Sequence, residues 1–306
     1  MPVIARHTIL NMYQQIISIT GPVFLLILLG FAVSKFKVEI HEKTIGFLLT
    51  HIGSPCLIFH TLATTNIQLN ILAEIFFSAI SVIFISSILA ITVIKIFKDE
   101  FSPYFSCLIH PNSANLALPL SILTYGEIGL VYAIPYYVVV AISQNTFGYL
   151  TILGSFRFLY MLYHPIFILS LLGLSILIFE INLPSVLINS SNYLGKLVIP
   201  LSLILLGYSL SNLKIKNFTK GLFYSIARFF IGFLSAFLII FFGDIEGPKA
   251  GVIMIMSTMP VGLLNYIFTV QVDKDTTSVA GLVVISTVLT LIVLPFLLNL
   301  LLHFYN

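Results

Sequence analysis

The chain has 306 residues, of which 59% are hydrophobic and 8% are charged, and its formal net charge is +3. Because a soluble domain carries about 25% charged residues, this composition excludes an ordinary soluble globular protein and indicates an integral membrane protein. The small net charge gives no indication of a nucleic-acid partner. The apolar composition indicates that the chain is surrounded by membrane lipid.

Ten apolar runs follow one another along the chain, separated by short polar or charged loops. Each is close to the roughly 20 residues that a helix needs to cross the bilayer. Their approximate ranges are 12–33, 44–62, 71–95, 104–124, 130–153, 159–179, 190–211, 221–242, 250–269 and 276–302. The first run is long for a signal peptide and no small-residue cleavage site follows it, so we expect it to remain as the first span. The sequence therefore predicts an all-α integral membrane protein with ten transmembrane helices.

The placement of Lys and Arg predicts the orientation of these spans. Most of these residues fall in alternate loops: Lys35, Lys37, Lys43, Lys95, Lys98, Arg157, Lys214, Lys216, Lys220 and Lys274. The opposite side carries Arg6 and Lys249, while Lys196 and Arg228 lie near span ends, where long side chains can reach the interface. The positive-inside rule then places both termini on the non-cytoplasmic side of a multi-pass protein in the cell membrane, the inner or plasma membrane.

The ten spans divide into two halves of five, 1–153 and 154–306. An odd number of spans per half inverts the second half relative to the first, and such inverted repeats are common in transporters. The fourth span of each half contains a proline, Pro111 or Pro260, and an asparagine follows four or five residues later. We therefore predict a 5+5 inverted repeat in which helices 4 and 9 are broken at these prolines.

The two breaks predict a binding site near the middle of the membrane. Proline removes a backbone N–H and clashes with the preceding turn, and two corresponding interrupted spans indicate a transporter's binding site. Helix N-termini created there would offer free N–H groups to a carboxylate or phosphate without a basic side chain. The candidate substrate-binding residues are Asn112, Ser113, Asn115, Gly262 and Asn265, with Ser257 and Thr258 as further neutral donors. The alternative is that each proline is only a structural kink.

Four other polar residues within the spans are candidates for proton or ion coupling. His110 adjoins the first break and His51 lies one turn before Pro55, and histidine titrates near neutral pH. Gln144 and Asn145 lie in the middle of the fifth span, where polar side chains face protein or a cavity. The alternative for all four is hydrogen-bonded packing.

Several segments carry a resemblance to a known family. They are "GSPCLIFHTLA" (Gly53–Ala63), "HPNSANLALPLSILTYGEIGL" (His110–Leu130), "PLSLILLGYSL" (Pro200–Leu210), "STMPVGLLNYIF" (Ser257–Phe268) and "STVLTLIVLP" (Ser286–Pro295). In their order and spacing they resemble the auxin efflux carrier family, the PIN-like transporters, most closely its compact bacterial members. The resemblance covers nearly the whole chain.

The resemblance implies a scaffold of spans 1, 2, 6 and 7, a transport domain of spans 3–5 and 8–10, and an elevator-like movement between them. It further implies that helices 4 and 9 cross, at Pro111 and Pro260. It also implies that Asn112, directly after the fourth-span proline, holds the substrate carboxylate, and that the substrates are organic acids such as malate or malonate. Two departures from the family are Ala117, where glycine is usual, and the loop between spans 5 and 6, reduced to about Gly154–Arg157.

The function expected is secondary active transport of small organic anions, with H⁺ or Na⁺ coupling and a homodimer left open. The alternative is a sodium-coupled organic anion symporter of the bile-acid symporter type, which shares the ten-helix repeat. Such sodium sites use carboxylates and backbone carbonyls, and spans 4, 5, 9 and 10 contain no deep Asp or Glu. An enzyme is not expected, because His41-Glu42 lacks the second histidine of the zinc protease motif. No cofactor or metal is expected either.

Overall fold

The computed structural model describes residues 2–65, 67–153, 162–212, 217–270 and 276–305, and nearly all of them are helical. The elements are α1 (Pro2–Lys35), α2 (Glu42–Phe47), η1 (Leu48–Gly53), α3 (Ser54–Thr64), α4 (Leu69–Phe97), α5 (Phe101–Ile109), η2 (Ser113–Ala117), α6 (Leu118–Ser143), η3 (Gln144–Gly148), α7 (Tyr149–Leu153), α9 (Pro165–Phe179), α10 (Ser185–Lys196), α11 (Val198–Asn212), α12 (Phe218–Phe242), α13 (Gly247–Thr258), α14 (Leu263–Val270) and α15 (Thr276–Phe304), where η marks a wider, π-helical turn. The loop Gly154–Arg157 and the basic residues Lys214, Lys216 and Lys274 lie outside the described residues.

Six helical runs within the described residues are long and apolar enough to cross a membrane. They are Thr44–Thr64, Leu69–Phe97, Ser113–Ile152, Ser185–Asn212, Phe218–Phe242 and Thr277–Phe304, with shorter apolar helices at Gly21–Lys35 and Pro165–Phe179. Gly126 divides the longest run, because its φ of 65° is a left-handed value that breaks the helical geometry of α6. The chain is therefore a multi-pass membrane protein in composition and in helix length, and the ten-span count stays a prediction.

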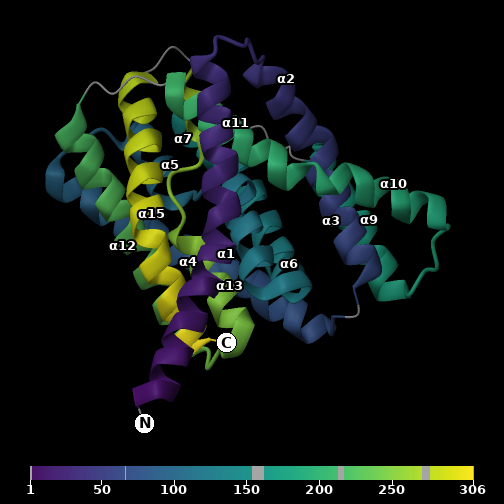
Figure 1. The fold of residues 1–306 in the computed structure, drawn as a ribbon. Helices are drawn as coiled ribbons and strands as arrows, with labels where there is room; N and C mark the ends of the chain where they lie inside the picture. The colour runs from purple at the N-terminus through teal and green to yellow at the C-terminus, as the bar shows by residue number, and fades with distance from the viewer. Residues whose placement is uncertain (1, 66, 154–161, 213–216, 271–275, 306) are drawn as a thin grey trace.

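The helices pack in two groups (Figure 1). In one group, α3 packs against α9 and α10, and these lie on one side of the molecule. In the other group, α12 packs against α4, α13 and α15. α1 packs along α11, and α6 contacts α13 and α4 as well as α3 and α9, so α6 lies between the two groups.

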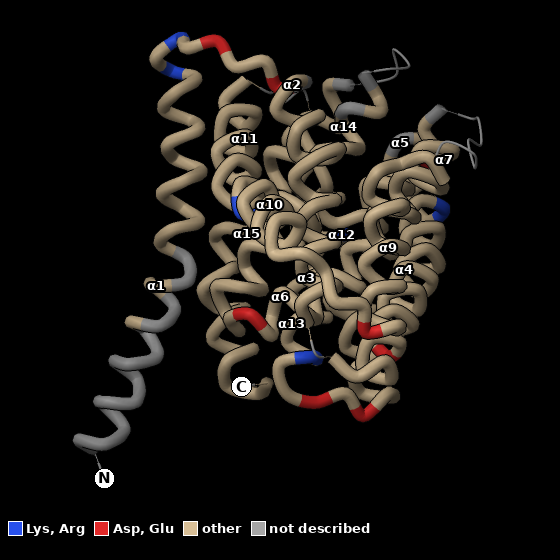
Figure 2. The backbone as a smooth tube through the Cα atoms, turned by 90° about the vertical axis from the view of Figure 1, so that its right-hand side faces the viewer, with Lys and Arg blue, Asp and Glu red and all other residues tan. Residues whose placement is uncertain are grey.

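The charged residues and the chain ends mark the two ends of the bundle. Most Lys, Arg, Asp and Glu residues lie toward these ends, and both termini lie at the same one (Figure 2). Two ion pairs join helices there, Lys249 with Glu74 (2.6 Å) and Lys220 with Asp99.

The expectation that Arg228 reaches the interface is wrong. α12 begins at Phe218, so Arg228 lies about 15 Å along the helix axis, near the middle of a span. Its side chain is only 1% exposed. The guanidinium turns inward, toward α13, and does not extend to the membrane surface.

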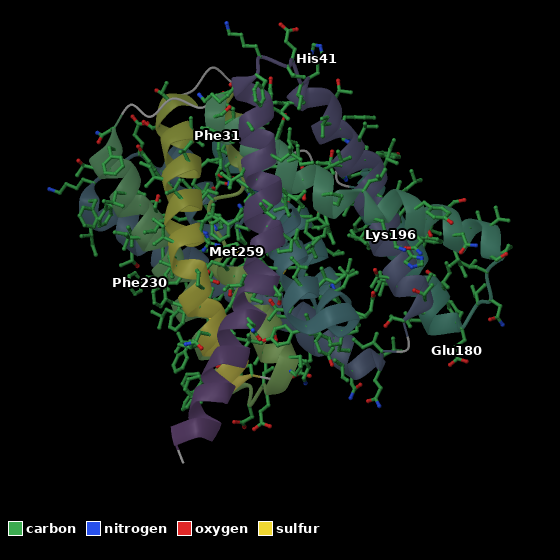
Figure 3. All side chains as sticks on the ribbon, viewed as in Figure 1. Phe31, His41, Glu180, Lys196, Phe230 and Met259 are labelled. Carbon is green, nitrogen blue, oxygen red and sulfur yellow. The ribbon has the colours of Figure 1, made fainter. Side chains whose placement is uncertain are left out.

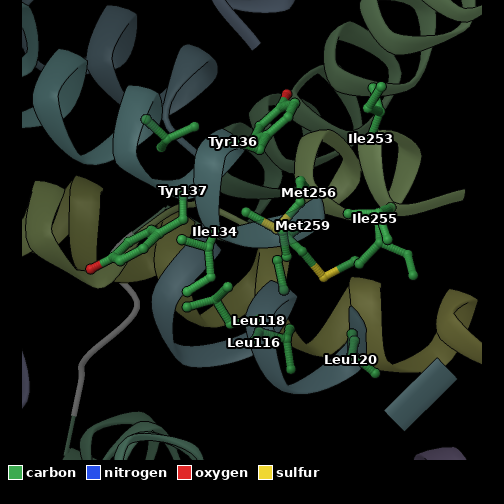
Figure 4. Close-up of a cluster of buried hydrophobic side chains, with 14 of the residues drawn as sticks. Leu116, Leu118, Leu120, Ile134, Tyr136, Tyr137, Ile253, Ile255, Met256 and Met259 are labelled. Carbon is green, nitrogen blue, oxygen red and sulfur yellow. The ribbon is translucent and has the colours of Figure 1, made fainter. Parts of the chain in front are cut away.

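The core between α6 and α13 surrounds the predicted site. It contains Leu116 of η2 and Leu118, Leu120, Ile134 and Tyr136 of α6. Ile253, Ile255 and Met256 of α13 and the adjoining Met259 complete it (Figure 4). Large apolar side chains are exposed on the outer helices, such as Phe230 at 62% on α12, as expected of a surface that faces lipid. The side chains of this cluster are buried and hydrophobic, so polar groups within it need partners.

Candidate functional site

Two helices are interrupted at prolines, and the interruptions meet. α5 ends at Ile109 and η2 begins at Ser113, while α13 ends at Thr258 and α14 begins at Leu263. The backbone N–H of Asn112 donates to the carbonyl of Pro260 (2.7 Å), and that of Gly262 donates to the carbonyl of His110 (3.2 Å). The result is a single antiparallel bridge between residues 110–112 and 260–262, which we call the crossing.

The crossing lies deep in the protein. Met259, the residue before Pro260, is buried and is seen near mid-height between the two ends of the bundle (Figure 3). Proline offers no N–H, and unpaired backbone groups are costly where water is excluded. The two bonds of the bridge satisfy part of this requirement, and Ser286 Oγ on α15 accepts the N–H of Val261 (3.1 Å).

Asn112 caps the start of η2, and its side-chain NH₂ group is unused. Its side-chain oxygen accepts the backbone N–H of Asn115 (3.3 Å) and so caps the new helix. Its Nδ2 group is buried and has no hydrogen-bond partner. Ser113, also buried, lies beside it with its hydroxyl 3.5 Å from the Pro111 carbonyl, and Asn115 is half-buried. An amide NH₂ can donate two hydrogen bonds, so the Asn112 side chain is available to a ligand that accepts them.

Gln144 reaches the same place from η3. Its Nε2 group is buried and has no hydrogen-bond partner. A Cβ atom added at Gly262 would lie 3.0 Å from this nitrogen and 3.1 Å from the carbonyl oxygen of Pro111. Glycine at position 262 therefore allows Gln144 and the two backbone segments to approach closely. The crossing thus holds two neutral amide NH₂ groups without partners, those of Asn112 and Gln144.

His110 is fully buried and connects three helices at the crossing. Its Nδ1 lies 3.0 Å from Ser106 Oγ and its Nε2 lies 3.0 Å from Ser143 Oγ. Ser106 gives its hydroxyl hydrogen to Asn265 Oδ1 (2.6 Å), so it accepts from His110, which assigns the proton to Nδ1. Asn265 in turn donates to the carbonyl of Gly262 (3.2 Å). A neutral imidazole satisfies every bond of this network, so the geometry needs no charge on His110.

Two of the predicted residues lie elsewhere. Asn145 donates to the carbonyl of Ala141 (2.8 Å) and lines a small pocket against His164 on the α9 side. His51 contacts Thr50 (2.8 Å from Nδ1) and lies 5.1 Å, between ring centroids, from the same His164. The structure therefore groups Asn145 of η3 and His51 of η1 around His164, at the start of α9, and brings Gln144 to the crossing.

Ser257 and Thr258 are not free donors. Their hydroxyls donate to the carbonyls of Ile253 (2.6 Å) and Met254 (2.7 Å), one turn earlier in α13. They extend the hydrogen bonding of the helix just before Pro260 and leave the donor role at the crossing to the amides.

The sequence interpretation missed Arg228 as part of this region. Its Nη2 donates to the carbonyl of Ser257 (2.8 Å), while Nε and Nη1 are buried without partners. Gly232, one turn on in α12, makes this contact possible because a Cβ there would collide with the Ser257 carbonyl. The signal available in the sequence was an arginine within a run of 25 helical residues, a pattern that indicates function in membrane proteins.

Comparison with known proteins gives two matches. The family model described as "Membrane transport protein" matches residues 16–157 and 151–298. An uncharacterized transporter of Methanocaldococcus jannaschii is 25% identical over 293 residues, which cover 89% of this chain and 94% of that protein. The family matches include both interrupted helices and every residue of the crossing.

Proposed function

The chain belongs to the membrane transport protein family, the auxin efflux carrier-like transporters, and on this premise we propose that it is a secondary carrier of small organic anions. Carboxylates such as malate or malonate are the substrate class. The observation that carries the proposal is the pair of buried amide groups, Asn112 Nδ2 and Gln144 Nε2, that have no hydrogen-bond partner where two interrupted helices cross.

The chemistry of the crossing favours an anion. An amide NH₂ only donates, and a carboxylate only accepts, with room for several hydrogen bonds on its two oxygens. Asn112 also stands at the start of the helical run of η2 and α6, where backbone N–H groups carry partial positive charge. The described segments α5, η2, α13 and α14 contain no Asp or Glu that would attract a cation instead.

Movement of the crossing between the two membrane faces would complete a transport cycle. In the 5+5 arrangement, α1, α2, α3, α9, α10 and α11 would form the scaffold. The moving unit would comprise α4–α7 and α12–α15. The packing of α12 on α4, α13 and α15, and of α3 on α9 and α10, supports this division. Since the crossing lies deep between both ends of the bundle, sliding of this unit would expose it to either side in turn, an elevator mechanism.

The test is uptake of labelled malate and malonate by the purified protein in proteoliposomes. We expect Asn112→Ala and Gln144→Ala each to lower uptake about tenfold, because each removes a donor from a desolvated site. Asn145→Ala is the matched control, since Asn145 neighbours Gln144 but bonds to its own helix. No uptake of either acid, or uptake that Asn112→Ala leaves unchanged, refutes the proposal. Uptake that requires Na⁺ would favour the sodium-coupled alternative.

A further inference from the structure

Arg228 has the largest side chain among the fully buried residues of the described chain, and it lies inside α12. Its one hydrogen bond goes from Nη2 to the carbonyl of Ser257 (2.8 Å), and Nε and Nη1 have no partner. A charge in the interior of a membrane protein is costly, and residues that carry one usually serve the transported ligand or ion. This cation therefore needs a functional explanation.

The groups around the guanidinium are neutral. Ser257 belongs to the last turn of α13, where carbonyl groups without helical partners carry partial negative charge. Cys107, His110 and Tyr136 are close enough to interact with it electrostatically, and none of them is a carboxylate. Arginine does not lose its proton in proteins. The positive charge of Arg228 is thus held by a helix end, with no acidic residue of the described chain bonded to it.

In contrast to Arg228, two lysines at the starts of α12 and α13 lie toward the ends of the bundle and are ion-paired. Lys249 at the start of α13 pairs with Glu74 (2.6 Å), and Lys220 at the start of α12 pairs with Asp99. These pairs cancel. Arg228 is the charge that remains in the interior of this part of the described structure. Its hydrogen bond to the carbonyl of Ser257, three residues before Pro260, places it close to the crossing.

We propose that Arg228 is the fixed positive charge of the substrate-carrying unit and that it offsets one negative charge of the bound organic anion. The inference rests on the proposed function, because it requires that α12 and the crossing move together. The amides of Asn112 and Gln144 contact the anion, and Arg228 supplies the opposite charge from behind the crossing. With a monovalent anion bound, the moving unit is electrically neutral inside the membrane. When empty, it carries one positive charge.

This charge balance determines how the membrane potential acts on each step. A neutral loaded unit does no electrical work as it crosses, so one-for-one exchange of a monovalent anion is insensitive to voltage. A divalent anion leaves the loaded unit with a charge of −1, and so does a monovalent anion when Arg228 is replaced by a neutral residue. In exchange, the potential speeds the crossing of the charged unit in one direction and slows its return, and the slower crossing limits the cycle. At about 100 mV, one charge moved across the whole membrane therefore slows such exchange by about threefold at saturating substrate.

The experiment measures exchange in proteoliposomes with and without a potassium diffusion potential. The probes are two matched pairs of anions at neutral pH, monomethyl malonate with malonate, and lactate with malate. The proteins are the wild type, Arg228→Met, which removes the charge, and Arg228→Lys, which keeps it. We expect voltage-insensitive exchange of the monovalent probes in the wild type and Arg228→Lys, and a threefold slowing in Arg228→Met. The divalent probes should be slowed in the wild type.

Each outcome decides the inference. Voltage-sensitive exchange of the monovalent probes by the wild type overturns it, and this measurement holds even if Arg228→Met does not fold. Voltage-insensitive exchange by Arg228→Met, or identical behaviour of the Lys and Met variants, also overturns it. If uptake depends on Asn112 while any of these results is obtained, the proposed function stands and only the role of Arg228 fails. If neither the four anions nor any variant shows transport, both fall together.

Discussion

Gly262→Ala should disrupt the crossing, because the added methyl group has no free space. Its Cβ would lie 3.0 Å from Gln144 Nε2, 3.1 Å from the Pro111 carbonyl oxygen and 3.5 Å from that of His110. The Pro111 oxygen belongs to the backbone of the partner segment, so the segments must separate there by a few tenths of an ångström, whereas the distance to the His110 oxygen is an ordinary contact. The bond from Gly262 N–H to His110 is already 3.2 Å long and would weaken further.

The loss of stability can be estimated from the backbone groups that lose their hydrogen bond. A buried backbone group that loses its hydrogen bond costs about 1–3 kcal/mol, so we expect the melting temperature in detergent to fall by several degrees. Because the methyl group also displaces the Gln144 amide, malonate uptake in proteoliposomes should fall about tenfold. The double variant Gly262→Ala with Gln144→Ala should recover part of the stability and none of the uptake, since it relieves only the side-chain contact.

Gly21→Ala is the matched control for this variant. The same methyl group at Gly21, in α1, would meet nothing within 4 Å. Alanine also favours a helix over glycine by about 1 kcal/mol, so this variant should be as stable as the wild type or more so. If Gly262→Ala melts and transports like Gly21→Ala, the close approach at the crossing is not what position 262 provides, and the reasoning is refuted.

Two further predictions concern groups around the crossing and at the end of the bundle. Ser286→Ala leaves the buried N–H of Val261 without its acceptor and should destabilise the protein by about 1–3 kcal/mol in thermal unfolding; an unchanged melting temperature would contradict this. Burial raises the pKa of Asp99, but hydrogen bonds from Lys220 and Tyr224 more than offset it, so its pKa lies below the usual value. The stabilisation by Asp99 is therefore present above about pH 4 and lost as the pH falls further. Asp99→Asn should flatten the melting temperature over that acidic range, and equal acid sensitivity in both proteins would refute it.

Proline chemistry made the interruptions at Pro111 and Pro260 predictable from the sequence, but not the residues that pair where the two interruptions meet. A residue that cannot donate a backbone bond, placed inside an apolar span, already points to a break. Which residues pair across the break depends on how the two helices are placed in space. The bridge between Pro111 and Val261, and the role of Ser286 as acceptor, come from that placement alone.

The phase of the helices explains why Gln144 and Asn145 received equal weight in the sequence interpretation. From the sequence, only regular helical periodicity could indicate which of these two neighbouring amides faces the crossing. The turn from Gln144 to Gly148 is π-helical, which adds a residue to the turn and shifts the phase. Arg228 was misjudged for a related reason: the apolar run predicts a span from 221, whereas α12 begins at Phe218, which moves the arginine toward the middle.

If Asn112 and Gln144 contact the anion and Arg228 supplies the opposite charge, binding contacts and charge compensation come from different residues. This separation suits a carrier. A charged side chain that touched the anion directly would bind it strongly in a desolvated site, and release at the far side would be slow. The amides of Asn112 and Gln144 offer weaker bonds that can exchange with water when the site opens. Arg228 acts from behind the crossing, where its hydrogen bond goes to the Ser257 carbonyl and not to the ligand. Its attraction for an anion depends on distance and charge and makes no direct bond that must break on release.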